Sequence, residues 1–252
     1  MDILSAALGS DEALDHNGLG VVRIAQLVGR EKTQVSRALK ALAAAGFADR
    51  DPDTRSYRLG WRLFALGARA GDARLLNAAA PVLDDLVEQT GETAHLSVLD
   101  DIEVLTILSE VPNAAVRASG WPGRRVPASC TSSGRALLFD HSADELDQRF
   151  AGRSLAGGGP NAARSLAQLH ARITADRARG VAVSDEEFEI GLVAVAAPVR
   201  SAKGAIVAAV NVSGPKFRLG TALDDAEHHA LAAAASLSTA LGNRPGLEAA
   251  TG

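Results

Sequence analysis

The chain has 252 residues, of which 47% are apolar and 22% charged, and its formal net charge is −4. This length is enough for one large domain or two ordinary ones, each with its own core. The single cysteine, Cys130, excludes a disulfide framework within the chain and fits a reducing compartment. No apolar stretch is long enough to span a bilayer, and the N-terminal residues do not resemble a signal peptide. We therefore expect a cytoplasmic protein without a membrane partner.

Positive charge is concentrated near the N-terminus. Residues 1–70 hold ten Lys or Arg and eight Asp or Glu, whereas residues 71–252 hold sixteen and twenty-two. From Val21 to Arg62, nine basic residues stand against four acidic ones. A small basic unit followed by a larger acidic one indicates two domains, and nucleic acid is a candidate partner for the first.

The basic unit begins with a short apolar helix candidate over residues 1–8, and two further helices are predicted after it. The first of these covers residues 21–28 and ends at Gly29. In the second, apolar residues recur from Val35 at i+3, i+4 and i+7, and Gly46 stands where such a helix ends. Its remaining positions carry basic, amide and hydroxyl side chains, namely Lys32, Thr33, Gln34, Ser36, Arg37 and Lys40.

A hairpin is predicted next, with Asp51-Pro52-Asp53-Thr54 as the turn between two short extended runs. Helix, turn, helix and hairpin in this order are typical of a winged helix-turn-helix, whose second helix enters the major groove of DNA. An ordinary solvated basic face is the alternative interpretation of that helix taken alone. Three arginines on or beside the hairpin would contact phosphates, namely Arg50, Arg55 and Arg58.

The larger unit alternates helices and strands, which predicts an α+β fold. A mostly helical stretch is interrupted at Gly71, and Pro81 either opens a helix or kinks one. Two hairpins are expected, one turning at Asp100-Asp101 and the other at Lys203-Gly204. A third short strand is predicted over 114–120, a loop over 121–127, and helices near 129–139, 143–150, 162–180 and 222–242.

Five stretches of the chain, in this order, resemble the isocitrate lyase regulator (IclR) family of bacterial transcription factors. They are "VSRALKALAAAGFADRDPDTRSYRLG", "GETAHLSVLD", "CTSSGRALL", "RGVAVSDEEFEIGLVAVAAPVR" and "IVAAVNVSGP". The resemblance covers essentially the whole chain. It implies a winged helix-turn-helix over residues 1–60, a linker helix over 61–71, and a GAF-like effector-binding and oligomerisation domain over 72–252. It also implies a homodimer, or a dimer of dimers, on a palindromic operator in double-stranded DNA, and it favours a repressor of a catabolic operon controlled by a small organic acid.

The resemblance places the effector site between the sheet and the loop and helix near residues 126–139. The start of that helix would present free backbone N–H groups to a carboxylate. The matching positions are Val126, Ser132, Ser133, Ser184, Leu192, Ala194, Asn211 and Ser213.

Three of these positions depart from the pocket that similar proteins use for small keto acids. Those proteins have an acid in place of Ser184, a Cys in place of Ala194 and a Ser in place of Asn211. This chain is therefore expected to have a neutral, roomier pocket that favours an aromatic or longer carboxylate. A shift of one residue would bring Asp185 into the place of the acid. Ordinary strand packing is the alternative interpretation of each of these residues.

Two other classes of protein compete with a ligand-responsive regulator. An enzyme would use Cys130 as nucleophile with His95 as base, but no Gly-x-Ser-x-Gly elbow or other supporting motif is present, and we expect no catalytic residue. One cysteine and the absence of a His pair at i, i+4 disfavour zinc. The acidic run 185–189 lacks the oxygen spacing of a calcium loop and is expected to be a solvated strand edge, so no metal and no cofactor are expected. A DNA-architectural protein that senses nothing is the other alternative, and saturable binding of a small acid would separate it from a sensor.

Overall fold

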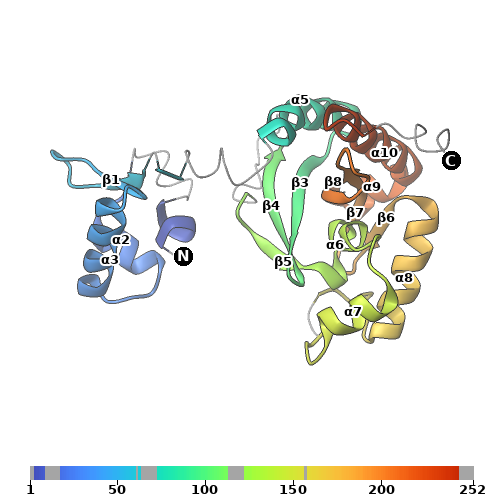
Figure 1. Ribbon diagram of the computed structural model, residues 1–252, viewed down its shortest axis with the longest axis horizontal. Coiled ribbons are helices and arrows are strands. Elements are labelled where there is room, and N and C mark those ends of the chain that lie inside the picture. Colours follow the sequence, from blue (N-terminus) through green and yellow to red (C-terminus); the bar gives the residue numbers. More distant parts are fainter. Residues whose placement is uncertain are drawn as a thin grey trace. The chain divides into compact units, whose positions relative to one another are not determined.

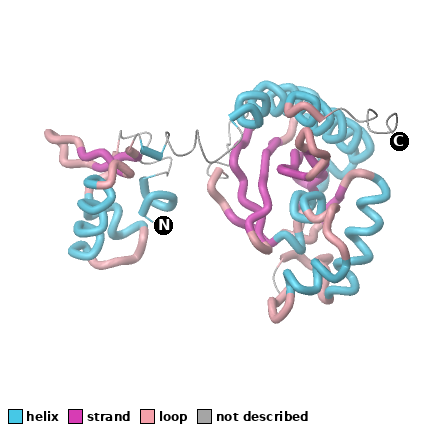
Figure 2. Tube along the Cα trace, in the orientation of Figure 1, coloured by secondary structure: helices cyan, strands magenta, loops and turns pink. Residues whose placement is uncertain are grey.

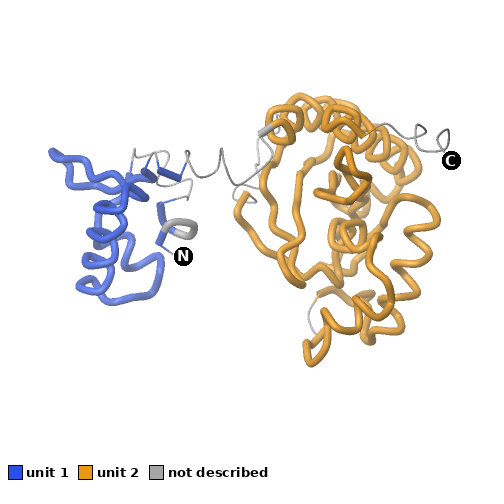
Figure 3. The backbone as a smooth tube through the Cα atoms, in the orientation of Figure 1, with its two compact units in different colours: residues 1–73 blue, residues 74–252 orange. Residues whose placement is uncertain are grey.

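The computed structural model describes residues 3–8, 18–60, 62–63, 73–112, 122–155 and 158–243. The chain divides into two compact units, residues 1–73 and residues 74–252 (Figure 3). Of the predicted linker helix over 61–71, only Arg62 and Leu63 are described, and both are helical. The strand predicted over 114–120 lies outside the described residues.

Unit 1 contains a short π-helical segment, two α-helices and a two-stranded hairpin (Figure 1). In chain order these are η1 (Ile3–Leu8), α2 (Val21–Leu27), α3 (Lys32–Ala44), β1 (Ala48–Arg50) and β2 (Tyr57–Leu59). The predicted apolar stripe of α3 is confirmed, because Val35 and Leu39 are fully buried and pack with Ile24 of α2. Unit 1 therefore has a core of its own.

The end of α3 and the hairpin turn both follow local chemistry. Gly46 has φ +76°, and the amides of Gly46 and Phe47 donate to the carbonyls of Ala43 and Leu42, which closes the helix. In the turn, the Asp51 carboxylate accepts hydrogen bonds from the amides of the two residues that complete it. These bonds, led by the one from the Thr54 amide, lower the pKa of Asp51.

Unit 2 contains one six-stranded antiparallel sheet with helices on both faces (Figures 1 and 2). The strand order is β5-β4-β3-β8-β7-β6. The strands are β3 (Thr93–Asp100), β4 (Glu103–Glu110), β5 (Arg125–Pro127), β6 (Ala182–Asp185), β7 (Leu192–Arg200) and β8 (Ile206–Pro215). The helices are α5 (Ala73–Thr90), η2 (Ala128–Cys130), α6 (Ser132–Leu137), α7 (Ala143–Phe150), α8 (Leu166–Arg179), α9 (Lys216–Leu219), η3 (Gly220–Ala222) and α10 (Leu223–Ala240). The predicted mixture of helices and sheet is thus observed.

The two faces of the sheet are separated by the alternation of side chains along each strand. On β7, Val193 and Val195 pack toward α5 and α10, whereas Ala196 packs toward α6 and α8. Figure 1 shows α5 and α10 on one side of the strands and α6, α7 and α8 on the other. No helix within the described part of the chain is both long and apolar enough to cross a membrane.

Two details of unit 2 differ from the sequence-based prediction. The loop predicted over 121–127 includes β5, which pairs with β4. The first hairpin turns one residue later than predicted, because Asp100 still pairs with Glu103 and Asp101 takes a left-handed φ of 57°. For Pro81, the structure agrees with the second of the two predicted alternatives, because this proline lies inside α5.

Candidate functional site

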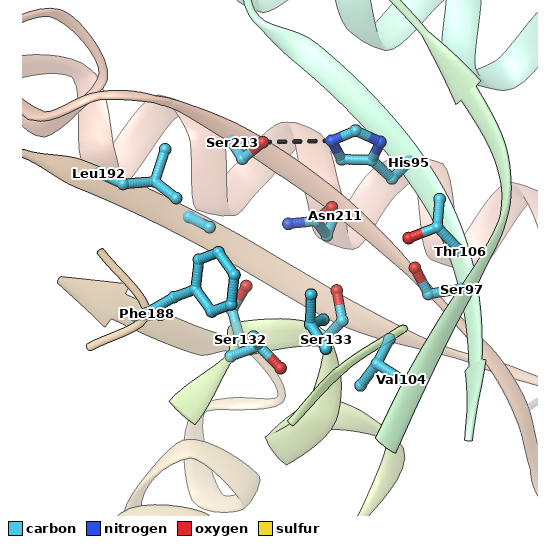
Figure 4. A pocket seen from close by; sticks show the side chains of 14 residues that line it. His95, Ser97, Val104, Thr106, Ser132, Ser133, Phe188, Leu192, Asn211 and Ser213 are labelled. Atoms are coloured by element: carbon cyan, nitrogen blue, oxygen red, sulfur yellow. Dashed lines mark hydrogen bonds between the residues drawn. The ribbon is translucent and has the colours of Figure 1, made fainter. Parts of the chain in front are cut away.

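A cavity lies on the sheet face that α6 covers (Figure 4). It encloses about 480 Å³, including the part that is open to solvent. It is lined by 14 residues, namely His95, Ser97, Val104, Thr106, Val126, Thr131, Ser132, Ser133, Ser184, Phe188, Leu192, Ala194, Asn211 and Ser213.

Strand alternation and register bring lining residues from three strands together. Along β7 and β8, the lining positions are two residues apart, so they face the same side of the sheet. Ala194 of β7 lies opposite Ser184 of β6 on one side and opposite Ser213 of β8 on the other. One row across the sheet therefore carries three of the predicted effector positions.

A second row adds polar groups from the neighbouring hairpin. Asn211 lies opposite His95 of β3, which in turn lies opposite Ser109 of β4. His95 Nδ1 is hydrogen-bonded to Ser109 Oγ at 2.7 Å, and His95 Nε2 to Ser213 Oγ at 3.2 Å. The imidazole is therefore held between two serine hydroxyls at the cavity wall.

The cavity wall opposite the sheet is the start of α6. Thr131 caps this helix, because its hydroxyl accepts a hydrogen bond from the Gly134 amide at 3.2 Å. Gly134 lets the helix approach the preceding turn, since a Cβ there would lie 2.1 Å from the Ala128 carbonyl oxygen. Ser132 is almost completely buried, and its Oγ has no hydrogen-bond partner among the described residues. Ser132 thus brings to the cavity wall a hydroxyl that is not engaged by the described residues.

The cavity is electrically neutral. Among the described residues that line it there is no acid, lysine or arginine, and burial lowers the pKa of His95 to about 4. The imidazole is therefore uncharged at neutral pH. Figure 4 shows the apolar side chains Phe188 and Leu192 on one side of the cavity and the hydroxyls of Thr106 and Ser97 on the other.

The structure places all eight predicted effector positions on the wall of this cavity. Six further lining residues were not predicted, namely His95, Ser97, Val104, Thr106, Thr131 and Phe188. The period-2 alternation of the first hairpin is the sequence signal that would have included four of them. Asp185 is not a lining residue. Its carboxylate lies 2.8 Å from Lys216 Nζ, so the one-residue shift considered for Ser184 does not occur.

The environment of Cys130 does not suit a nucleophile. The thiol is buried, and desolvation raises its pKa to about 11, so it stays protonated at neutral pH. The proposed base, His95, is hydrogen-bonded to serines instead. The run 185–189 also differs from the predicted solvated strand edge, because Glu187 is buried and pairs with Arg135.

The nine residues predicted to contact DNA all lie in unit 1, and none of them is buried. On α3, the basic residues are exposed and lie away from Val35 and Leu39. Within the described part of the chain, Lys32, Arg37 and Lys40 form no ion pair. On the hairpin, Arg50 and Arg58 are exposed on the two strands, and Arg55 has a left-handed φ of 60° in the turn. The exposed side of unit 1 is therefore cationic.

Comparison with known proteins agrees with this architecture. Residues 68–239 match the family described as bacterial transcriptional regulator IclR, C-terminal. The chain is 32% identical over 223 residues to the HTH-type transcriptional regulator BhcR of Paracoccus denitrificans, which covers 84% of this chain and 79% of that protein.

Two solved structures are similar over most of their length. An IclR transcriptional regulator from Alicyclobacillus acidocaldarius has a TM-score of 0.74 and 27% identity, over 95% of this chain and 96% of that one. An IclR homologue from Microbacterium hydrocarbonoxydans, complexed with 4-hydroxybenzoate, has a TM-score of 0.73 and 24% identity, over 89% and 91% of the two chains.

The matched region spans the whole sheet of unit 2, including the cavity. The family match and the similarity to known regulators identify a regulator of transcription rather than an enzyme. The chain belongs to the IclR family of bacterial transcriptional regulators, and unit 2 contains the C-terminal effector domain of that family.

Proposed function

We propose that this chain is a ligand-responsive, DNA-binding transcriptional regulator. Unit 1 reads double-stranded DNA, and the cavity of unit 2 binds a small organic acid. The observation that carries the proposal is the division of unit 1 into an apolar core and an exposed basic face that spans α3 and the hairpin. A solvent-facing collection of cations on a helix and an adjoining hairpin suits the phosphates and base edges of a duplex.

In this proposal unit 1 is a winged helix-turn-helix. Helix α3 enters the major groove, where Arg37 and Lys40 reach phosphates or guanine edges and Gln34 addresses adenine. The hairpin is the wing, and its three arginines contact the flanking phosphates. In a dimer, or a dimer of dimers, two such helices enter successive major grooves about 34 Å apart on a palindromic operator.

The cavity of the GAF-like unit 2 favours a ligand with one anionic end and an apolar body. Ser132 offers a hydroxyl without a partner among the described residues, and Asn211 offers a neutral amide. Phe188 and Leu192 suit an apolar or aromatic body. Because the described residues that line the cavity include no cation, an acid with a single carboxylate fits better than a dicarboxylate, which would bury a second charge.

Ligand binding controls transcription only if the ligand has different affinities for two states of the protein. We propose that the two states differ in their affinity for the operator, and that the protein represses a catabolic operon until the acid is bound. An architectural protein that senses nothing would lack this coupling.

Binding to the DNA upstream of the chain's own gene tests the proposal. Fluorescence anisotropy compares this duplex with a scrambled one at several salt concentrations, with and without a panel of aromatic and aliphatic monocarboxylates that includes 4-hydroxybenzoate. We expect binding that is stronger on the native duplex and that one acid changes. Equal binding to both duplexes, lost as salt rises, would leave only non-specific attraction to phosphate. Specific binding that no acid alters, together with calorimetry that detects no bound acid, would favour the architectural protein.

A further inference from the structure

One wall of the cavity is carried by a segment that has neither helix nor strand. Residues 186–191 connect β6 to β7, and Phe188 in this segment lines the cavity. The Phe188 ring packs against the apolar cluster on this face of the sheet, and the guanidinium carbon of Arg124 lies 5.9 Å from the ring centroid. The neighbouring side chain, Glu187, is turned inward and is only 7% exposed. What fixes this segment therefore also fixes the shape of the cavity.

Glu187 belongs to a cluster of four charged side chains, of which Arg135, Asp176 and Glu187 are buried and Arg172 is half-buried. Arg135 of α6 is 1% exposed, and its Nη1 lies 2.5 Å from Glu187 Oε2. Its Nε lies 2.6 Å from Asp176 Oδ2 of α8, and its Nη2 donates to the Val183 carbonyl of β6. Arg172 of α8 makes a second ion pair with Glu187. Two cations and two anions balance, which is what a buried cluster of charges requires.

The cluster joins two walls of the cavity. Arg135 lies on the same six-residue helix as Ser132 and Ser133, which line the cavity from below the sheet. Glu187 immediately precedes Phe188, which lines it from the side. The Arg135–Glu187 pair is therefore a direct side-chain connection between the start of α6 and the Phe188 segment.

The main chain at Glu187 is fixed as well. Its carbonyl accepts a hydrogen bond from the Gly159 amide at 2.6 Å. Gly159 has no room for a side chain, because a Cβ would lie 2.0 Å from the Glu186 carbonyl oxygen. Glu186 is held separately, by Lys216 Nζ at 2.9 Å and by the Gly191 amide. Of these contacts, only the Glu187 side chain ties the segment to α6.

A buried ion pair contributes little net stability, but breaking it is costly, since a displaced charge would lose its partner in a medium of low dielectric constant. We propose that Glu187, through its ion pair with Arg135, is a positioning residue that holds Phe188 against the cavity and so sets its shape before any ligand binds. The role in ligand selection rests on the proposed function of the cavity, whereas the positioning of Phe188 does not.

Asp176 provides a matched control. Glu187→Gln and Asp176→Asn each remove one negative charge from the same arginine while keeping an oxygen that accepts its hydrogen bond. Only Glu187 adjoins Phe188, since Asp176 lies on α8. A general effect of unbalancing the cluster would appear in both variants. A positioning effect would appear in Glu187→Gln alone.

The first readout is ¹⁹F NMR of the full chain labelled with 4-fluorophenylalanine, with the Phe188 signal assigned by its loss in Phe188→Leu. We expect this signal to shift or broaden in Glu187→Gln and to stay in place in Asp176→Asn. Amide hydrogen exchange over residues 186–192 should rise by roughly tenfold in Glu187→Gln, while exchange in α10 stays unchanged. If Glu187→Gln fails to fold, Glu187→Asp keeps the charge with a shorter side chain and should also displace the Phe188 signal.

An unchanged Phe188 signal in the Glu187 variants, or the same change in Asp176→Asn, would overturn the proposal. The ligand arm uses 4-hydroxybenzoate as probe in calorimetry. If the wild-type protein binds it, we expect weaker binding in Glu187→Gln than in Asp176→Asn, and equal binding would remove the role in ligand selection. If the wild-type protein does not bind this acid, the spectroscopic and exchange results still decide whether Glu187 positions Phe188.

Discussion

Asn211 on β8 lies directly opposite His95 on β3, and both side chains line the same cavity. The histidine is 3% exposed, and both of its ring nitrogens are hydrogen-bonded to serine hydroxyls. A histidine that stays neutral over the physiological pH range keeps the cavity free of charge. Its low pKa also predicts that acid lowers the free energy of unfolding, and that replacing His95 removes this effect.

Burial lowers the pKa of His95 from 6.5 to about 4, so between these values the unfolded chain binds more protons than the folded protein. The free energy of unfolding should therefore fall as the pH is lowered from 6.5 toward 4, and this loss should be absent above pH 6.5. We expect His95 to account for roughly 2–3 kcal/mol between pH 6.5 and 4.5. Urea denaturation at stepped pH measures it, with His95→Gln as the control that removes this titration. Identical pH profiles of the two proteins would contradict the assignment of a depressed pKa.

Substitutions on the exposed face of α3 should weaken DNA binding without unfolding the chain. Arg37→Ala and Lys40→Ala each remove an exposed cation, and each should lower the salt slope of operator binding by roughly one unit if the side chain contacts a phosphate. The melting temperature should be unchanged. Lys203→Ala, which removes an exposed lysine from a turn of unit 2, is the matched control and should leave binding intact. A fall of several degrees in the melting temperature of Arg37→Ala or Lys40→Ala would mean that these side chains support the fold.

Because the Ser132 hydroxyl has no hydrogen-bond partner among the described residues, its removal should weaken ligand binding without lowering the free energy of unfolding. Ser132→Ala removes a buried hydroxyl without a partner, so the free energy of unfolding should stay unchanged or rise slightly. Binding of the acid that the native protein recognises should weaken, as measured by calorimetry. Ser142→Ala is the opposite case, because Ser142 forms a capping box with Glu145 at the start of α7. This control should lose about 1 kcal/mol of stability and bind the acid normally. A Ser132→Ala protein that is clearly destabilised would show that the hydroxyl has a structural role.

The glycine inside α6 predicts a strong steric effect. In Gly134→Ala, the new Cβ would meet backbone atoms of Ala128 at 2.1 and 2.3 Å, so the helix and the preceding turn must separate. We expect a loss of about 3 kcal/mol or more in thermal or urea denaturation. Gly220→Ala is a suitable comparison, since its φ is −62° and the nearest atom lies at an ordinary contact distance of 3.5 Å. It should change stability by less than about 1 kcal/mol. Equal effects of the two substitutions would argue against close packing at Gly134.

Elements with a strong local pattern were predictable from the sequence. The stripe beginning at Val35, the glycine at position 46 and the turn beginning at Asp51 identify α3 and the hairpin, because periodicity and turn chemistry act over a few residues. The resemblance to a family supplied the eight predicted effector positions, which all line one cavity. The place of Pro81 in α5 was not predictable, because a proline within a helical pattern is compatible with the first turn of a helix and with a kink inside it.

The surroundings of the polar side chains were decided only by the tertiary structure, because they depend on contacts between residues far apart in the sequence. His95 was a candidate base until the register of β3 placed it beside Asn211 and between two serines, where burial holds it neutral. Glu187 was assigned to a solvated edge because an acidic run usually faces water, and its partner Arg135 lies 52 residues away. Local sequence specifies which face of an element is apolar. Whether a polar side chain is buried, paired or exposed to a ligand depends on which distant elements pack against it, and only the folded chain brings those together.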